Sequence, residues 1–450
     1  MQLTDILKIY ARQPAVAGLI APISQNLQSR IKLNNINGSL KAFVMAAVVE
    51  KTQGSHLVIV SDREEAAFFL NDIENLLGDN SALYYPASYK KAYDVEDIDN
   101  ANVLLRAEAL NKINNAPNPL IIVTYPEALL EKVVTRSQLT TNTLKVTINT
   151  KLSIDFITDL LFEYSFERVD FVYEPGQFSV RGGIVDIFSF SNNLPYRVEF
   201  FGDDVESIRT FNPETQLSVE PLVSINIIPN IQNSQLMQTR ESFLNYIPAD
   251  TTIWTDGYTN ALNVIKQEFV KAEKIYAELS KTINHAKPDE MYLTAKEFET
   301  QTQGRNIVEF GINNHFPAAQ KVNFNSSPQP HFNKNFDLLA KQMLENADLG
   351  YKNYILADTP KQIERIYAIF EDGNLRLRLA KQLDRVEVQI PFSPIYTGIH
   401  AGFTDHDQRI ACFAEHQIFD RYQRFKLKKV FKRQSLLPLK TFTTLKMATL

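Results

Sequence analysis

The chain has 450 residues, of which 44% are hydrophobic and 22% charged, a composition typical of folded globular proteins rather than of disordered chains. Its 47 lysines and arginines against 52 aspartates and glutamates give a net charge of −5, which excludes a polybasic protein that coats nucleic acid through net charge alone. The single cysteine, Cys412, excludes an intramolecular disulfide and any multi-cysteine metal site, and it indicates a reducing compartment. No apolar run reaches the ~18 residues that a transmembrane helix needs, and the N-terminus lacks the pattern of a secretory signal. We therefore expect a soluble, cytoplasmic protein of about three domains.

Five segments along the chain repeat one pattern: a short apolar run, a capping residue and then a stretch with helical periodicity. Runs of this kind indicate buried parallel strands, and a Ser, Thr or Asp before the following helix accepts hydrogen bonds from its unpaired N–H groups. The alternation predicts α/β layers built on parallel sheets. The five apolar runs are 57–60, 120–123, 251–254, 354–357 and 410–414.

The middle of the chain breaks this alternation. Two strand-like runs, 178–190 and 195–211, are separated by a short turn-rich stretch and preceded by a helix-like segment at 152–166. They predict a small α+β insert that contains an antiparallel hairpin. The helix after 251–254 has unbroken three- and four-residue apolar spacing, which favours a packed amphipathic helix, with a coiled-coil arm as the alternative. Residues 321–337 are polar, and we expect them to form a linker.

A degenerate phosphate-binding loop is visible at 35–43, which reads NINGSLKAF. A working loop needs glycines that let the backbone approach the phosphates, a lysine, and a Ser or Thr hydroxyl for magnesium. Gly38 and Lys41 occupy fitting positions. Leu40, however, stands where a glycine should precede the lysine, and Ala42 cannot ligate a metal. The pattern favours an inert structural turn, and nucleotide hydrolysis through Lys41 is the alternative.

Arginines gather in the predicted insert. Arg168 and Asp170 would share one face of an extended segment, as would Arg197 and Glu199. Arg181 comes directly before a Gly-Gly pair. Guanidinium groups on a small hairpin can hold the carboxylates of a partner through paired N–H···O bonds. Internal ion pairs, for instance between Arg181 and Asp186 or between Arg197 and Glu199, are the alternative.

Two other segments could contact nucleic acid. Residues 84–97 contain four tyrosines and two lysines, which could stack on bases and bind phosphates, but the acidic residues Asp94, Glu96 and Asp97 oppose this. The segment 421–433 has seven basic residues and no acidic one, which also fits a solvated helix face or a helical linker. We find no histidine spacing that predicts a metal site and no arrangement of catalytic residues, so His400, His406 and His416 are expected in loops or caps.

Several motifs together resemble a known family. They read YYPASYKKAYDVEDIDNANVLLRAEAL, IIVTYPEALLEKVV, FERVDFVYEPGQFSVRGGIVDIF and YRVEFFGDDVESIRTFNPETQ. From about residue 20 to its end, the chain resembles the excision-repair subunit UvrB. It is still more similar to the amino-terminal UvrB-like module of bacterial transcription-repair coupling factors.

The resemblance implies a domain plan. A degenerate P-loop-NTPase-like α/β domain would comprise residues 1–130 and 216–325, interrupted by a UvrA-binding α+β insert at 131–215. A further α/β domain would follow at 335–430. Residues 431–450 would form a basic linker toward a polymerase-binding domain that this chain does not contain.

The resemblance also implies a function: a non-enzymatic fragment that recruits UvrA to stalled RNA polymerase. The matching UvrA-binding positions are Arg168, Arg181, Arg197 and Glu199, whereas Ser179 stands where UvrB has another arginine. It implies no catalytic residue, no metal and no cofactor in this chain. ATP would be used only by the full-length family protein, which contacts RNA polymerase and DNA through its C-terminal domains. A DNA-binding or NTP-hydrolysing UvrB-like repair protein is the alternative.

Overall fold

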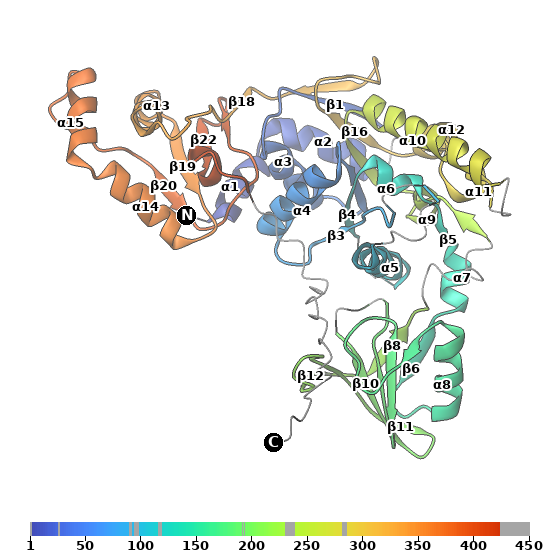
Figure 1. Cartoon of the computed structure of the whole chain (residues 1–450). Helices are drawn as coiled ribbons and strands as arrows, with labels where there is room; N and C mark the ends of the chain where they lie inside the picture. Colours follow the sequence, from blue (N-terminus) through green and yellow to red (C-terminus); the bar gives the residue numbers. More distant parts are fainter. Residues whose placement is uncertain are drawn as a thin grey trace, which may run out of the picture.

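The computed structural model of the chain describes residues 2–25, 28–89, 92–93, 99–115, 119–190, 192, 194–229, 239–280 and 286–423. It is an α/β protein with three parts (Figure 1): a central sheet covered by helices, an insert at the bottom of the view and a C-terminal part on its left. This confirms the predicted fold class. Among the described residues, no helix is long and apolar enough to cross a membrane.

The central part is built on a parallel seven-stranded sheet in the order β17-β1-β16-β15-β2-β4-β3. Three of its inner strands, β2, β4 and β16, are buried along their whole length, as expected of strands in the middle of a covered parallel sheet. The strands are β1 (Arg30–Asn34), β2 (His56–Ile59), β3 (Ala82–Tyr84), β4 (Ile121–Thr124), β15 (Thr252–Asp256), β16 (Ile307–Phe310) and β17 (Gln320–Asn323).

Helices cover this sheet, and α4 begins at Asp62, one of the capping residues that follow the apolar runs. The side chain of Asp62 accepts hydrogen bonds from two backbone N–H groups at the start of α4. The long helix α10 packs against α6 and α12 and buries Ile265 and Ala272, so it is a packed amphipathic helix and not a projecting arm. The helices are α1 (Leu3–Tyr10), α2 (Pro14–Ser24), α3 (Leu40–Val49), α4 (Arg63–Leu77), α5 (Asn100–Asn115), α6 (Pro126–Leu130), α7 (Arg136–Thr141), α9 (Phe243–Tyr246), α10 (Tyr258–Leu279), α11 (Pro288–Met291) and α12 (Ala295–Gln303).

The insert has its own hydrophobic core between a six-stranded sheet, in the order β12-β11-β10-β9-β8-β7, and the helix α8. All neighbours in this sheet are antiparallel except β7 and β8. A separate pair, β6 and β13, closes the insert where the chain enters and leaves it. The elements are β6 (Leu144–Thr147), α8 (Ile154–Glu163), β7 (Glu167–Arg168), β8 (Gln177–Arg181), β9 (Ile184–Ile187), β10 (Tyr196–Phe201), β11 (Asp204–Phe211), β12 (Ser218–Leu222) and β13 (Ser224–Ile227).

The insert differs in extent from the predicted range of 131–215. At its start, β5 (Val133–Val134) pairs with β14 (Arg240–Glu241), and both valines pack in the core of the central part. At its end, β12 and β13 lie beyond residue 215 and pair with β11 and β6. The insert therefore comprises 144–227. The predicted range ended too early because the exposed strand β12 carries too little apolar sequence to be recognised as part of a sheet.

The C-terminal part is a mixed five-stranded sheet in the order β18-β21-β22-β19-β20, and one of its faces shares the core of the central part. Residues 321–337 are not a linker. Most of β17 and all of β18 lie in this range, and they are edge strands of two different sheets. Their polar side chains, typical of exposed edge strands, hid them from the hydrophobic pattern. The elements are β18 (Ser326–Pro328), α13 (Phe336–Asp348), β19 (Lys352–Leu356), α14 (Pro360–Phe370), α15 (Gly373–Gln382), β20 (Ser393–Ile395), β21 (Phe403–Asp405), β22 (Ile410–Ala414) and α16 (Glu415–Ile418).

Candidate functional site

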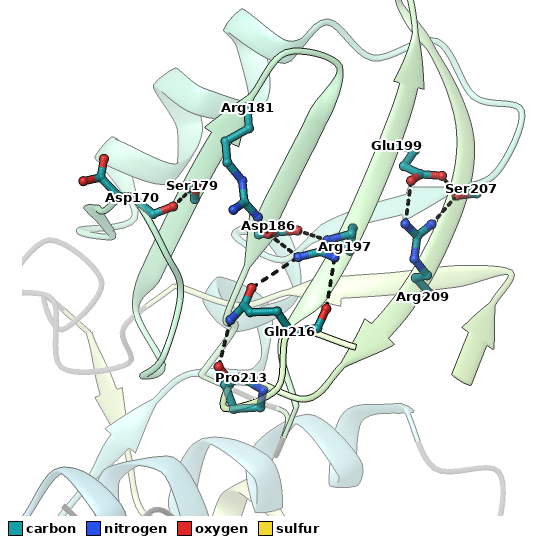
Figure 2. Close-up of polar contacts among 10 residues, drawn as sticks. All are labelled: Asp170, Ser179, Arg181, Asp186, Arg197, Glu199, Ser207, Arg209, Pro213 and Gln216. Atoms are coloured by element: carbon teal, nitrogen blue, oxygen red, sulfur yellow. Dashed lines mark hydrogen bonds and ion pairs between the residues drawn. The ribbon is translucent and has the colours of Figure 1, made fainter. Parts of the chain in front are cut away.

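One face of the insert sheet carries a row of polar side chains, which we call the arginine face. Side chains alternate along each strand, so every second residue of β8 to β11 packs toward α8 and the others point away from it. The strand register places four of the latter side by side across the sheet (Figure 2). They are Ser179, Asp186, Arg197 and Arg209.

Asp186 is the centre of this face. Its carboxylate is 1% exposed and accepts two hydrogen bonds from Arg197, from Nε at 2.7 Å and from Nη2 at 2.8 Å. It also accepts a hydrogen bond from Arg181. The internal pair between Arg181 and Asp186 that the sequence left open is therefore formed, and two guanidinium groups share one buried carboxylate.

The other internal pair considered from the sequence, Arg197 with Glu199, is not formed. Asp186 lies directly opposite Arg197 in the register, and cross-strand neighbours are closer than residues two apart on one strand. Glu199 instead accepts hydrogen bonds from Arg209 and from the Ser207 hydroxyl. These bonds lower the pKa of Glu199 to about 2, so its carboxylate stays charged at any physiological pH.

The arginines differ in how much of each side chain is exposed. Arg181 is 39% exposed, and its guanidinium lies 5.0 Å from the ring centroid of Phe171. Arg197 is only 14% exposed, lies 4.4 Å from the ring centroid of Phe211 and donates to Gln216 in addition to Asp186. Arg181 therefore has N–H groups to offer a partner, whereas those of Arg197 are used inside the insert.

One predicted position, Arg168, does not lie with the others. Arg168 is exposed on the edge strand β7 and is in register with Phe178, whose side chain packs against α8, so Arg168 lies on the opposite side of the sheet from Arg181. Ser179, where the resemblance to UvrB led us to expect an arginine, lies on the same side of the sheet as Arg181 but is 2% exposed, and its hydroxyl donates to the carbonyl oxygen of Asp170. The buried position explains why a small residue fits there.

The insert also has exposed aromatic side chains, and none of them was predicted as a binding residue. Phe201 is 79% exposed at the end of β10, in the same alternating set as Arg197 and Glu199. Phe171 and Tyr173, in the loop before β8, are 48% and 51% exposed. The signal was present for Phe201, because a phenylalanine at an outward position of an alternating strand has no core to fill.

The predicted phosphate loop connects β1 to α3. Gly38 has a φ of +55°, a conformation that favours glycine. The ammonium of Lys41 lies 3.6 Å from a carboxylate oxygen of Glu65 and 3.5 Å from one of Asp256. Ala42 is fully buried in the core. The lysine is thus neutralised by carboxylates of its own chain, and no hydroxyl stands where magnesium would need one.

The remaining candidates from the sequence are the tyrosine-rich segment, the basic segment and the histidines. Among their residues, Tyr84, Tyr85 and His406 pack or form hydrogen bonds within the chain. Tyr84 and Tyr85 are 5% and 0% exposed, and Tyr85 stacks on Phe243 at 3.7 Å, so neither ring is available to a nucleic-acid base. The two lysines at 90–91, residues 94–98 and the basic segment from 424 onward lie outside the described residues. His406 bonds to Tyr351 and Ser327. No group of three or more metal-ligating side chains is placed to hold an ion within the part of the chain that the structure describes.

Comparisons with known proteins agree with this geometry. The family model of the UvrB interaction domain matches residues 144–232, which begins at the first strand of the insert and ends just beyond its last. A transcription-repair-coupling factor of Bacillus subtilis is 28% identical over 47% of this chain and 18% of its own length. The corresponding protein of Borreliella burgdorferi is 28% identical over 64% of this chain and 24% of its own length.

A UvrABC system protein B from Ureaplasma parvum is 25% identical over 67% of this chain and 43% of its own length. These findings confirm the resemblance inferred from the sequence. The chain spans about a fifth of the length of the two coupling factors. A solved DEAD box protein from Methanococcus jannaschii, 12% identical with a TM-score of 0.27 over 86% of this chain and 76% of its own, is too distant to carry an argument.

Proposed function

We propose that the chain is a recruitment module of transcription-coupled repair, whose insert binds a UvrA-type protein through the arginine face. The observation that carries this proposal is the half-exposed Arg181, whose guanidinium lies 5.0 Å from the ring of the exposed Phe171, on the segment that matches the UvrB interaction domain. Arginine and aromatic residues are enriched at protein interfaces, and arginine, tyrosine and tryptophan are the side chains that most often dominate the binding energy. Recruitment to stalled RNA polymerase would depend on parts of the coupling factors outside the region matched here.

The charge distribution of the insert supports recognition by local pairing. Residues 144–227 contain six lysines and arginines against thirteen aspartates and glutamates, and three of the six basic residues lie on the arginine face. The insert as a whole would repel an acidic partner. Only a partner that aligns its carboxylates with Arg181 gains the charge-assisted hydrogen bonds, so the face selects by position and not by net charge.

Arg181 and Arg197 have different roles in this proposal. Arg181 binds the partner directly, because its guanidinium is the more exposed of the two that bond Asp186. Arg197 is a positioning residue, since it fixes the Asp186 carboxylate that in turn holds Arg181. Glu199 holds Arg209 in the same way. Arg168, on the other side of the sheet, contributes less than Arg181.

The experiment that tests the proposal measures the affinity of the whole chain for purified UvrA. Arg181→Ala should weaken binding by about 2–5 kcal/mol, the usual cost of truncating one member of a buried interfacial charge pair. Lys145→Ala is the matched control, because Lys145 is an exposed cation of the same insert on the separate β6–β13 pair. Undiminished affinity of the Arg181 variant would remove the site assignment.

The sequence left nucleotide hydrolysis through Lys41 open as an alternative. We further propose that the chain does not hydrolyse nucleotides. Lys41 already pairs with Glu65 and Asp256, and Ala42 supplies no ligand for magnesium. Calorimetric titration with Mg-ATP should give no binding heat. Saturable binding that disappears in Lys41→Ala would favour the enzymatic alternative instead.

A further inference from the structure

The phosphate-like loop is in direct contact with the C-terminal part of the chain. The backbone N–H of Ser39 donates to the carbonyl oxygen of Ala401 at 2.9 Å, and the N–H of Ala401 donates to the Ser39 hydroxyl at 2.9 Å. Two residues earlier in the loop, the Asn37 side chain donates to the carbonyl oxygen of Ser326 at 2.9 Å. In a working loop, N–H groups of this kind bind phosphate oxygens. In this chain they bind main-chain carbonyl oxygens of the C-terminal part instead.

Gly38 shows how close this contact is. A Cβ atom at Gly38 would lie 2.6 Å from the carbonyl oxygen of Gly402 and 2.8 Å from that of Ala401. In phosphate-binding loops a glycine lets a phosphate approach the backbone. Here the same lack of a side chain admits the segment 399–402. We propose that the former phosphate loop is a docking site for this segment, and that this joint fixes the C-terminal part to the central sheet.

Side chains of α4 complete the joint. Asp72 is 3% exposed, and its carboxylate accepts hydrogen bonds from the Ser39 hydroxyl and from the N–H of His400, the latter at 2.8 Å. The side chain of Asn75 donates to the carbonyl oxygen of Gly398 at 2.9 Å. Every residue from 398 to 401 except one thus has a polar contact with α4 or the loop, which is the density of contacts expected of a specific docking site.

Apolar contacts continue the joint below the loop. The rings of Phe43 on α3 and Phe403 on β21 have centroids 5.6 Å apart, and Tyr10 on α1 lies 5.6 Å from Phe43 and 6.5 Å from Phe403. These aromatic residues belong to one core that spans the central and C-terminal parts. A polyphosphate would need the space of the 401–402 carbonyl groups and the N–H of Ser39. It could therefore bind only after the joint had opened.

The sole cysteine provides a probe of this joint. Cys412 lies on β22, is 1% exposed and has its carbonyl oxygen 2.7 Å from where a Cβ of Gly402 would be. A disulfide exchange reagent can modify it only when the C-terminal sheet separates from its surroundings. The labelling rate of Cys412 in the whole chain therefore measures how often the joint opens.

Gly38→Ala should accelerate Cys412 labelling at least tenfold, because the new methyl group collides with two carbonyl oxygens. Gly182→Ala is the matched control: its φ of +59° imposes the same backbone strain, but nothing lies within 4 Å of the new Cβ, so its labelling rate should stay within twofold of the parent. The fluorescence of Trp254, the single tryptophan and a buried residue of β15, reports whether the central sheet remains folded.

Ser39→Ala is the second variant, for the case that Gly38→Ala does not fold. It removes the hydroxyl that joins Asp72 to Ala401 while adding no atom. Its labelling should also accelerate, by at least threefold. Parent-like labelling of the folded variants, with native Trp254 fluorescence, would overturn the proposal. Because the insert is untouched, UvrA affinity should not change in either variant, which keeps this outcome separate from that of the docking proposal.

Discussion

Substitution of Asp186 should separate the stability of the insert from its docking function. Asp186→Ala removes a carboxylate that is 1% exposed and leaves Arg197, which is 14% exposed, without its counter-charge. Breaking a buried ion pair by removing one partner costs about 3–5 kcal/mol. The lower end applies here, because Arg197 keeps its contacts with Gln216 and Phe211, and Arg181 can turn toward solvent. We therefore expect the free energy of unfolding of the insert to fall by about 3 kcal/mol.

The two arginine variants give the comparison. Arg197→Ala should cost nearly as much stability as Asp186→Ala, because it breaks the same bidentate pair and leaves Asp186 buried. Arg181→Ala should cost about 1 kcal/mol or less, since pairs that involve an exposed side chain contribute little to stability. For UvrA affinity the order is reversed: Arg181→Ala loses the direct contact, whereas the other two variants act only by releasing Arg181.

Urea unfolding followed by far-ultraviolet circular dichroism, with hydrogen exchange of the β9 and β10 amides, measures the stability of the insert. UvrA affinity is measured by biolayer interferometry at a temperature where all three variants are folded. The reasoning is refuted if Arg181→Ala destabilises the insert as much as Asp186→Ala does. It is equally refuted if Asp186→Ala leaves unfolding unchanged, because Asp186 would then not be the anchor of this face.

Two further predictions concern single aromatic residues. Phe201→Ala should weaken UvrA binding by about 2 kcal/mol, as expected of a hot-spot ring, whereas Phe156→Ala, on the exposed side of α8, should not change it; equal effects would contradict the assignment of the face. The hydrogen-bond partners of His56 are uncharged, and burial lowers the pKa of His56 from 6.5 to about 4. As the pH falls below 6.5, His56 therefore takes up a proton in the unfolded state but stays neutral in the native state. This difference lowers the free energy of unfolding by about 2 kcal/mol at pH 5. Urea unfolding followed by Trp254 fluorescence should show this loss in the parent and less of it in His56→Gln, and equal pH dependence of the two would disprove it.

Much of the central fold could be predicted from the sequence, because its signals are local. The apolar run 120–123 and the cap at Asp62 each act within a few residues, and the structure has β4 and α4 where they indicate. The segment 125–134 was harder. It reads as one helix, but α6 ends at Leu130 and Val133–Val134 form β5, because pairing with a strand more than one hundred residues away overrides helix propensity.

The arginine face shows what the sequence could and could not give. Alternation along β10 was sufficient to place Arg197 and Glu199 on one side of the sheet. Which carboxylate each arginine pairs with depends on the register between strands, and that register placed Asp186 opposite Arg197. The contact between Gly38 and residues 401–402 was beyond any local pattern, because it joins loops more than three hundred residues apart.

Partner binding should protect the insert alone, because its core is separate from the core of the central part. The buried apolar residues between β6 and β13 form their own cluster, from Val146 to Ile227. Distant sites without shared partners contribute additively to stability. A ligand present at 100 times its Kd stabilises the domain that it binds by about 2.7 kcal/mol. Saturating UvrA should therefore slow hydrogen exchange of β8 to β11 by about a hundredfold while exchange around Trp254 stays unchanged. Uniform protection of both regions would show instead that UvrA binds across the two parts, and that the arginine face is only a fraction of its site.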